Sequence, residues 1–308
     1  MMKNRLSDPK VTRAVISRYD FDFRKRFGQN FLVDEGVILR TLEAAQVSRQ
    51  DVIFEIGPGI GTLTQYLSEA ARQVVSIEID KKLIPILEET LSECGNVDLI
   101  NQDVLKVDLN ALARSYNAGR NAGASSGSSA SPTPYSLKIV ANLPYYITTP
   151  ILMSLFRSKV PAQSVTVMVQ KEVADRMCAG PGSKDYGSLS VAVQYYSAPR
   201  IVEQVPPSSF LPHPKVTSAI VTMDLYEEPP VQAADEHLFD AIVRAAFEQR
   251  RKTLVNALSS SPAVPYGKKQ VQDALASLGL DASIRGEKLS IPDFARLSDR
   301  LAETGTAG

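Results

Sequence analysis

The feature that most constrains this chain is a regular alternation of short apolar runs with segments of helical spacing. Each run has the length of a buried strand, and the runs are DVIFEIG (51–57), QVVSIEID (73–80), VDLINQD (97–103), LKIVANL (137–143) and SVTVMVQ (164–170). Amphipathic segments such as GTLTQYLSEAA (61–71) separate them. This alternation predicts an α/β fold with a parallel, doubly wound sheet. The later runs APRIVEQV and AIVTMDLY favour an antiparallel addition at one sheet edge.

The C-terminal part has a different pattern. After the proline-rich segment EEPPV (227–231), three stretches of helical spacing follow without strand-like runs. We therefore expect a Rossmann-like domain over residues 1–229 and a small all-α domain over residues 230–308. Within the first domain, 16 of the 18 residues from 117 to 134 are Gly, Ser, Ala, Pro or Asn. Such a segment buries too little apolar surface to order itself, so we expect a flexible surface loop.

Charge and composition narrow the classes of partner. Lys plus Arg equals Asp plus Glu, at 34 each, so the formal net charge is zero. A polyanion must then be held by a local basic patch. Residues 1–30 hold eight basic and three acidic residues, which favours either such a patch or a solvated tail.

Cysteine and histidine usage argues against a metal centre. The two cysteines and two histidines lie far apart and lack metal-ligand spacing. No apolar run approaches the roughly 18 residues of a membrane span. The basic N-terminal segment is not followed by the apolar segment that a secretory signal contains. We expect a cytoplasmic protein that binds no membrane and no metal.

A glycine-rich turn follows the first predicted strand in FEIGPGIGTLT (54–64). Glycines let the backbone turn sharply and let a ligand approach closely. The spacing is G-x-G-x-G, whereas a dinucleotide fingerprint is G-x-G-x-x-G. The loop therefore favours a ligand other than a dinucleotide.

Acidic residues end the next two strands. Glu78 follows Gly57 by 21 residues in the sequence. At this sequence separation a carboxylate can accept hydrogen bonds from the ribose hydroxyls. Asp103 ends the third strand and suits an exocyclic adenine amine. A glycine turn with two such acids describes a nucleoside cofactor without a phosphate clamp, and S-adenosyl-L-methionine fits this description. Each acid alone is also explained as a helix N-cap or an exposed loop residue.

The fourth strand ends in NLPYY (142–146). Pro144 stops the strand, and places Asn142 at its tip, where α/β folds bind ligands. The Asn142 side chain and the Leu143 backbone offer two acceptors that can hold the hydrogens of an aromatic amine, and Tyr145 can stack on its ring. The alternative is a strand-to-helix turn whose tyrosines pack into the core.

Taken together, the chain resembles the small-subunit ribosomal RNA adenine N6,N6-dimethyltransferases (KsgA/RsmA type). Besides the motifs above, KRFGQNFLVD (25–34), FLPHPKVTSAIV (210–221) and FEQRRKTLVNAL (247–258) are similar to family motifs, and the resemblance runs from about residue 24 to about residue 300. It implies a Rossmann-like S-adenosylmethionine-dependent methyltransferase domain with a helical, rRNA-binding C-terminal domain. The implied substrate is a pair of adjacent adenosines in the 3′-terminal hairpin loop of 16S rRNA, within an immature small subunit. The enzyme is expected to be a monomer.

The resemblance also implies residue roles. Asn30 and Leu32 would contact the methionine end of the cofactor beside Gly57 and Gly59, with Glu78 on the ribose and Asp103 on the adenine. Asn142 would lie near both the methyl group and the target amine, with Leu143 and Pro144 completing the catalytic motif. Tyr145 and Phe210 would stack on opposite faces of the target base, although Phe210 is also explained by core packing. The residues implied to contact RNA phosphates are Arg24, Lys25, Arg26, Arg250, Arg251 and Lys252.

Two other functions stay open on the sequence. One is an RNA-binding ribosome-assembly factor with little catalysis, which the intact NLPY motif disfavours. The other is a nicotinamide-dependent oxidoreductase, which the glycine spacing disfavours.

Overall fold

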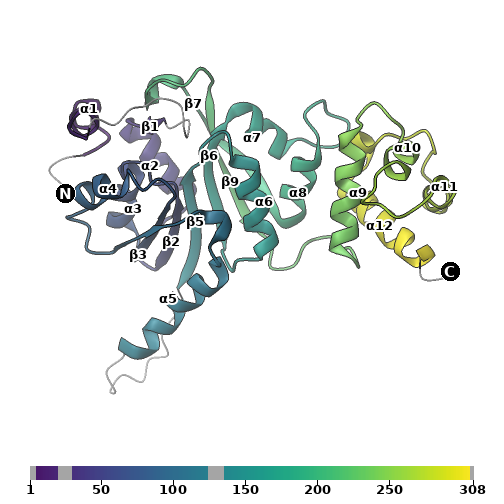
Figure 1. Cartoon of the computed structure of the whole chain (residues 1–308), viewed down its shortest axis with the longest axis horizontal. Coiled ribbons are helices and arrows are strands. Elements are labelled where there is room, and N and C mark those ends of the chain that lie inside the picture. The colour runs from purple at the N-terminus through teal and green to yellow at the C-terminus, as the bar shows by residue number, and fades with distance from the viewer. Residues whose placement is uncertain (1–4, 20–29, 124–134, 306–308) are drawn as a thin grey trace. The chain divides into compact units, whose positions relative to one another are not determined.

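The computed structural model describes residues 5–19, 30–123 and 135–305. The chain forms two compact units (Figure 1). The first comprises the described residues up to Ala174 together with Arg200–Leu225, and the second comprises Asp175–Pro199 and the described residues from Tyr226 onward. The sequence pattern predicts residues 175–199 to lie in the first domain. In the structure they contribute Tyr186, Val191 and Tyr195 to the buried core of the second unit.

The first unit is built on a seven-stranded sheet of order β4-β3-β2-β5-β6-β9-β7. The strands are β2 (Asp51–Ile56), β3 (Gln73–Glu78), β4 (Val97–Asn101), β5 (Ser136–Asn142), β6 (Ser164–Gln170), β7 (Ser197–Val205) and β9 (Ser218–Leu225). The five strands from β4 to β6 pair in parallel, and β9 joins β6 antiparallel. The expected α/β fold, with its antiparallel addition, is thereby confirmed.

The helices of the first unit connect these strands. They are α1 (Pro9–Arg18), α2 (Glu35–Ala44), α3 (Thr62–Ala70), α4 (Ile84–Thr90), α5 (Leu109–Gly123), α6 (Thr148–Ser158) and the start of α7 (Lys171–Cys178), with short 3-10 turns η1 (Val104–Lys106) and η2 (Pro207–Ser209). Strand β2 is buried along its whole length, as expected for a strand covered on both faces. The chain adds β3 and β4 on one side of β2 but β5 and β6 on the other, so its direction reverses between β2 and β5. Ligands of open α/β sheets bind at this reversal point.

A two-stranded ribbon holds the 30–34 segment in place. Strand β1 (Phe31–Leu32) pairs antiparallel with β8 (Phe210–Leu211), with Leu32 opposite Phe210. Beyond the ribbon, the Ser209 hydroxyl donates to Asp34 Oδ2 at 2.8 Å. Asp34 also caps α2 by accepting from the Val37 amide at 3.2 Å. Two sequence motifs that are about 180 residues apart therefore form one structural element.

The N-terminal segment contains a docked helix, α1, where the sequence allowed a solvated tail. Val15 and Ile16 on this helix are buried, as is Leu6 before it. The Leu6 amide donates to Gln65 Oε1 at 3.1 Å, and Ser7 Oγ lies 2.6 Å from Tyr66 Oη. The buried residues of this helix, Thr12, Val15 and Ile16, have helical spacing, which a count of charged residues does not register. Residues 20–29, which carry Arg24, Lys25 and Arg26, lie outside the described residues.

The expected loop over residues 117–134 is partly helical. Helix α5 extends to Gly123, so residues 117–123 belong to it. The expectation was therefore wrong for this part: the helix that LNALARSY begins continues through NAGRNAG despite its two glycines, because extending a nucleated helix costs less than starting one. Residues 124–134 lie outside the described part of the chain.

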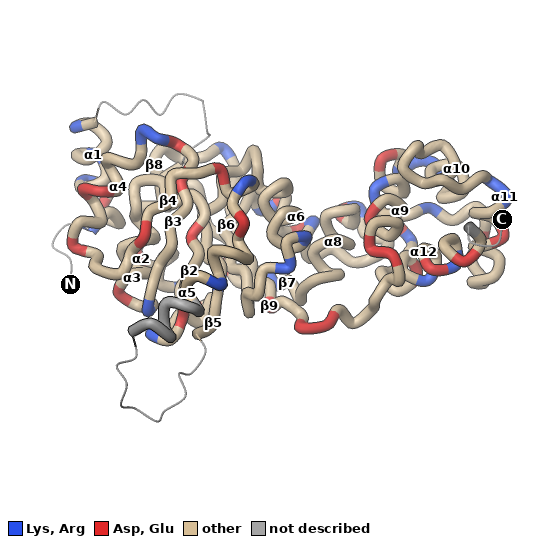
Figure 2. Tube along the Cα trace, turned by 60° about the horizontal axis from the view of Figure 1, so that its bottom comes forward, with Lys and Arg blue, Asp and Glu red and all other residues tan. Residues whose placement is uncertain are grey.

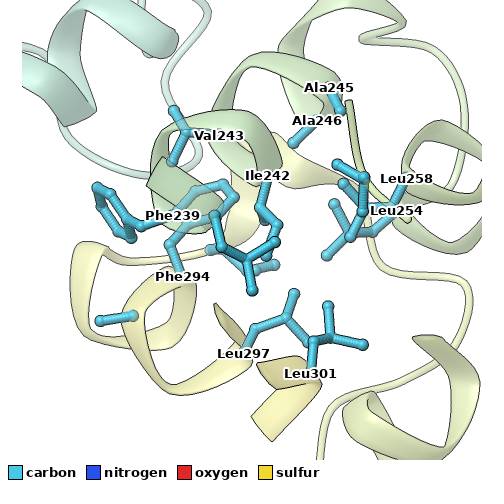
Figure 3. Close-up of a cluster of buried hydrophobic side chains, with 14 of the residues drawn as sticks. Phe239, Ile242, Val243, Ala245, Ala246, Leu254, Leu258, Phe294, Leu297 and Leu301 are labelled. Atoms are coloured by element: carbon cyan, nitrogen blue, oxygen red, sulfur yellow. The ribbon is translucent and has the colours of Figure 1, made fainter. Parts of the chain in front are cut away.

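The second unit is helical, as the sequence predicts for the C-terminal part. It contains the second half of α7, then α8 (Ser188–Tyr196), α9 (Glu236–Glu248), α10 (Leu254–Ser259), α11 (Lys268–Ser277), the turn η3 (Gly286–Lys288) and α12 (Ile291–Gly305). Figure 3 shows Ile242 of α9, Leu254 of α10 and Leu297 of α12 turned toward one another, and each is fully buried. Among the described residues, no helix is long and apolar enough to span a membrane, and no group of three metal-binding side chains occurs.

A buried ion pair joins β2 to β5 at the end of the sheet opposite Asn142. Lys138 Nζ donates to Asp51 Oδ2 at 3.0 Å and to the Gln46 carbonyl at 2.6 Å. Asp51 also accepts from the Ser48 amide at 2.7 Å. The Lys138 and Asp51 side chains are only 11% and 3% exposed, so both charges are largely shielded from water.

We expect Lys138→Met to destabilise the first unit by about 3–5 kcal/mol, because it leaves the Asp51 charge buried and unpaired. The measurement is urea unfolding of the full chain. The control is Lys269→Met, which removes an exposed pair with Asp273 and is expected to cost about 0.5 kcal/mol or less. Equal effects of the two variants would contradict this interpretation.

Candidate cofactor and substrate pocket

One pocket of about 1020 Å³, including its open mouth, lies where β2, β3, β4 and β5 end. Ten of the eleven residues predicted for the site line it: Asn30, Leu32, Gly57, Gly59, Glu78, Asp103, Asn142, Leu143, Pro144 and Tyr145. The pocket lies at the point where the strand order reverses, so the fold itself brings these separate motifs together.

The glycine loop, which connects β2 to α3, lines the pocket. Gly57 has φ of +69° and Gly59 has φ of +61°, which side-chain-bearing residues rarely adopt. A Cβ on Gly59 would lie 3.1 Å from the Phe31 ring. The loop is therefore fitted closely against β1, and glycine at this position keeps the backbone accessible to a ligand.

Glu78 lies at the end of β3 with only 4% of its surface exposed. Its Oε1 accepts from the Asp80 amide at 2.8 Å, and burial raises the pKa of the carboxyl to about 7. Asp103 accepts from the Leu105 amide at 3.0 Å and so caps η1. The capping role considered from the sequence is real for Asp103, and the same residue also lines the pocket.

Glu55 is a further acid of this pocket, in addition to those predicted from the sequence. It is 1% exposed, and its Oε2 accepts from Thr64 Oγ1 at 2.6 Å and Ser76 Oγ at 2.8 Å. Burial raises its pKa to about 7, an effect that the two hydroxyl donors partly offset. The sequence signal for Glu55 was an acidic residue within the strand β2, which is buried along its whole length. A charged side chain is buried in this way only where it has partners.

Asn142 is oriented by a contact with the β1 segment. Its Nδ2 donates to the Asn30 carbonyl at 3.2 Å. An amide has its donor and acceptor on opposite arms, so this contact leaves Oδ1 as the acceptor that Asn142 offers at the tip of β5. That oxygen can accept a hydrogen from a ligand amine.

The two tyrosines after Pro144 differ in environment. Tyr145 is half-buried, its hydroxyl lies 2.5 Å from Ser218 Oγ, and burial raises its pKa. Tyr146 is 56% exposed and lines the pocket. Burial of its hydroxyl and the nearby carboxylates of Glu78 and Asp103 raise the pKa of Tyr146. The alternative in which both rings pack into the core does not describe Tyr146.

Phe210 does not line the pocket. It is fully buried, pairs with Leu32 across the β1–β8 ribbon and belongs to the core cluster that contains Val205 and Ile220. Its predicted stacking on a base stays a prediction.

Glu55 generates a pH-dependent expectation for stability. Its pKa of about 7 in the folded chain lies above the unfolded value of about 4.3. The folded state therefore binds more protons than the unfolded state between these values, and stability falls as pH rises through this window.

Glu55→Gln keeps an acceptor for Thr64 and Ser76 without the charge. We expect it to stabilise the chain by about 3 kcal/mol at pH 8 and to have little effect near pH 4. Chemical denaturation at several pH values measures this. Glu43→Gln, at an exposed position on α2, is the control. A Glu55→Gln variant that is less stable than the parent at pH 8 would show that the charge is structurally required.

Known proteins share both the sequence and the fold. The family model described as "Ribosomal RNA adenine dimethylase" matches residues 20–303. A ribosomal RNA small subunit methyltransferase A from Lachnoclostridium phytofermentans is 51% identical over 97% of this chain and 98% of its own length. One with the same description from Alkaliphilus oremlandii is 47% identical over 97% of this chain and 99% of its own.

Solved structures agree with this relationship. A dimethyladenosine transferase from Plasmodium falciparum superposes with a TM-score of 0.71 at 25% identity, covering 89% of this chain and 98% of that one. The 23S rRNA methyltransferase ErmE superposes with a TM-score of 0.61 at 27% identity, over 89% of this chain and 100% of its own. The chain has the fold and the pocket described above, and it matches the family and a close relative over nearly its full length. It therefore belongs to the ribosomal RNA adenine dimethylase family.

Proposed function

We propose that this chain transfers methyl groups from S-adenosyl-L-methionine to N6 of two adjacent adenosines in the 3′-terminal hairpin loop of 16S rRNA, two methyls to each. The observation that carries the proposal is the orientation of Asn142, whose Nδ2 is held by the Asn30 carbonyl. Near full-length relatives described as small subunit methyltransferases support the choice of RNA. A substrate in the large subunit, the substrate class in the description of ErmE, is less well supported because that protein is only 27% identical.

The pocket fits this cofactor in the chemistry of its donors and acceptors. Glu78 would accept hydrogen bonds from the ribose hydroxyls and Asp103 from the adenine amine, with the methionine end over Gly57 and Gly59 beside Asn30 and Leu32. When bound, the cofactor supplies an electrophilic methyl group on a positively charged sulfur. Three buried or half-buried acids, Glu55, Glu78 and Asp103, give the pocket a negative character that favours such a ligand.

The strand tip of β5 would hold the target amine. Asn142 Oδ1 and the Leu143 carbonyl each accept one amine hydrogen, which draws the nitrogen lone pair out of conjugation with the ring. Pro144 fixes the corner between these acceptors and Tyr145, and the Tyr145–Ser218 hydrogen bond pins the ring on which the base stacks. Positioning then contributes most of the catalysis. No strong base is needed, because the nitrogen that has gained a methyl group carries a positive charge and readily releases a proton to water.

Phe210 is the second stacking ring in this proposal. It is fully buried against the partner strand β1, so a base would reach it only after local opening of the β1–β8 ribbon.

The second unit presents exposed cations on three segments that hydrogen bonds bring together. The Gly182 amide donates to the Glu287 carbonyl at 2.7 Å, and the Leu254 amide donates to the Ile284 carbonyl at 2.7 Å. The exposed cations on these segments are Lys184, Arg251, Lys252, Arg285 and Lys288. We name this set the 184–288 basic surface. Figure 2 shows both blue and red residues along the second unit.

Arg250 differs from its neighbours in the predicted phosphate-contact motif. Its Nη2 donates to the carbonyls of Lys184 and Tyr186 at 2.8 and 3.1 Å, and it lies 3.5 Å from Glu287. Arg250 is thus already used to hold the segments of the basic surface together. We infer that Arg251 and Lys252, rather than Arg250, contact RNA phosphates.

We also infer that the protein acts as a cytoplasmic monomer on immature small subunits.

An experiment on the whole reaction tests the proposed function. The full chain is incubated with labelled cofactor and small subunits that lack the modification, and with large-subunit rRNA as comparison. We expect labelled N6,N6-dimethyladenosine in the 16S rRNA alone. Binding to small subunits without methyl incorporation would instead favour the assembly-factor alternative.

We expect Asn142→Ala to lower the methylation rate about 100-fold or more, because misplacement of reacting atoms by about an ångström has effects of this size. Cofactor affinity, measured by calorimetry, is expected to change far less. Asn142→Asp, of the same size but without the amide donor, is the matched variant. Unchanged turnover in Asn142→Ala would exclude the assigned role.

We expect the double variant Arg251→Ala/Lys252→Ala to flatten the dependence of log affinity for rRNA on log salt by roughly 1.4–1.8. The control, Lys269→Ala/Arg296→Ala, removes two exposed cations that are paired with Asp273 and Asp293 on their own helices, and is expected to flatten the slope less. Equal slopes for both double variants would show that the basic surface does not meet phosphate.

A further inference from the structure

The pocket has an exposed aromatic ring, Tyr146, to which the proposed function gives no role. Tyr146 lines the pocket, and 56% of its surface is exposed. The residue before it, Tyr145, is half-buried and hydrogen-bonded to Ser218 Oγ. A large ring that is exposed at the wall of a pocket gains free energy when a ligand covers it. Tyr146 is therefore a candidate ligand contact.

A turn at the start of α6 sends the two tyrosines to different sides of β5. The Ile147 amide and Thr148 Oγ1 both donate to the Pro144 carbonyl, at 3.2 and 3.1 Å, and these bonds hold the turn. Tyr145 reaches β9, which lies on one side of β5 in the sheet order. Tyr146 lies near acids at the ends of β3 and β4, which are on the other side. The two rings therefore serve different parts of the pocket.

The part of the pocket beside Tyr146 has the chemistry of a nucleoside site. Burial and the nearby carboxylates of Glu78 and Asp103 raise the pKa of the Tyr146 hydroxyl. Ile79, which follows Glu78, also lines the pocket and is 47% exposed, and the half-buried Val104 follows Asp103. Hydrogen-bond acceptors beside exposed apolar groups fit a flat aromatic ligand that has donors at its edge. The adenosine part of the cofactor is such a ligand.

The same acids argue against a nucleotide of the RNA at this position. The target base is proposed to stack on Tyr145, on the β9 side of the strand. A neighbouring nucleotide placed on Tyr146 would bring its phosphate toward Glu78 and Asp103, and charges of the same sign repel one another. The positively charged cofactor meets no such repulsion.

We propose that the Tyr146 ring packs on the adenine of S-adenosyl-L-methionine and shields it from water. The inference rests on the proposed function for the identity of the ligand. It assigns the two consecutive tyrosines to different ligands, with Tyr145 on the substrate base and Tyr146 on the cofactor.

Calorimetry on the full chain with two ligands measures this contact. S-adenosylhomocysteine carries an amino-acid end, whereas 5′-methylthioadenosine has the adenosine and the sulfur without that end. We expect Tyr146→Ala to weaken both about tenfold, the effect of losing one aromatic stacking contact. Tyr146→Phe keeps the ring and is expected to retain most of the affinity. Tyr226→Ala, at an exposed position in the second unit, is the control and should leave both affinities unchanged.

Tyrosine emission tests the contact independently of affinity. The chain contains 11 tyrosines and no tryptophan, so its emission comes from tyrosine. A purine stacked on a tyrosine ring quenches that ring's emission. We therefore expect saturation with 5′-methylthioadenosine to quench the parent chain more than Tyr146→Phe. This comparison does not need Tyr146→Ala, so it still tests the proposal if that variant does not fold.

Several outcomes would overturn the proposal. Unchanged affinity of Tyr146→Ala for 5′-methylthioadenosine would exclude the contact, and weaker binding of cofactor-free Tyr146→Ala to rRNA would then assign the ring to the RNA. Equal quenching of the parent and Tyr146→Phe would also contradict it. Because Tyr146 is mostly exposed, the Tyr146→Ala chain is expected to melt close to the parent, and a large loss of stability would mean that the ring serves the fold. Failure of the parent chain to bind either ligand would count against the proposed function instead.

Discussion

The pairing of β2 with β5 is the constraint on which the rest of the site depends. In this parallel register Glu55 lies opposite Val140, so β2 runs into the glycine loop beside the point where β5 runs into Asn142. Both strands are covered on both faces by apolar side chains, and the Lys138–Asp51 pair locks their opposite ends. A register shift of one residue would turn each strand's side chains over. The hydrophobic core therefore determines which motifs meet in the pocket.

Two acids of the pocket are buried where their charged form destabilises the fold. Glu55 and Glu78 are both almost fully buried, and burial raises the pKa of each to about 7. In a ligand-free chain near neutral pH, part of each population is protonated. A cationic ligand with hydroxyl and amine donors favours the ionised carboxylates. Ligand recognition and local destabilisation thus have the same cause, as is common at functional sites.

The sequence predicts much of this arrangement because strand tips are local features. The ends of apolar runs locate Gly57, Glu78, Asp103 and Asn142, and parallel pairing brings them together. Other features depend on tertiary contacts that no local pattern records. The docking of α1 depends on Gln65 and Tyr66 of α3, and the structural role of Arg250 depends on a chain reversal near Lys184. Phe210 had two readings from sequence, and its burial beside Leu32 follows from the β1–β8 ribbon. An acid inside the apolar run 51–57 was a local signal for Glu55, but its partners Thr64 and Ser76 lie on other elements and are known only from the structure.

The central claim is that the amide of Asn142, held by Asn30, presents its oxygen to the N6 amine of an adenosine. The most direct measurement is a crystal structure of the full chain with S-adenosylhomocysteine and an RNA hairpin that carries the two adenosines. The account predicts Asn142 Oδ1 at hydrogen-bond distance from one N6, about 2.7–3.2 Å, with the base stacked on Tyr145. A bound adenosine whose amine lies remote from residue 142 would contradict it.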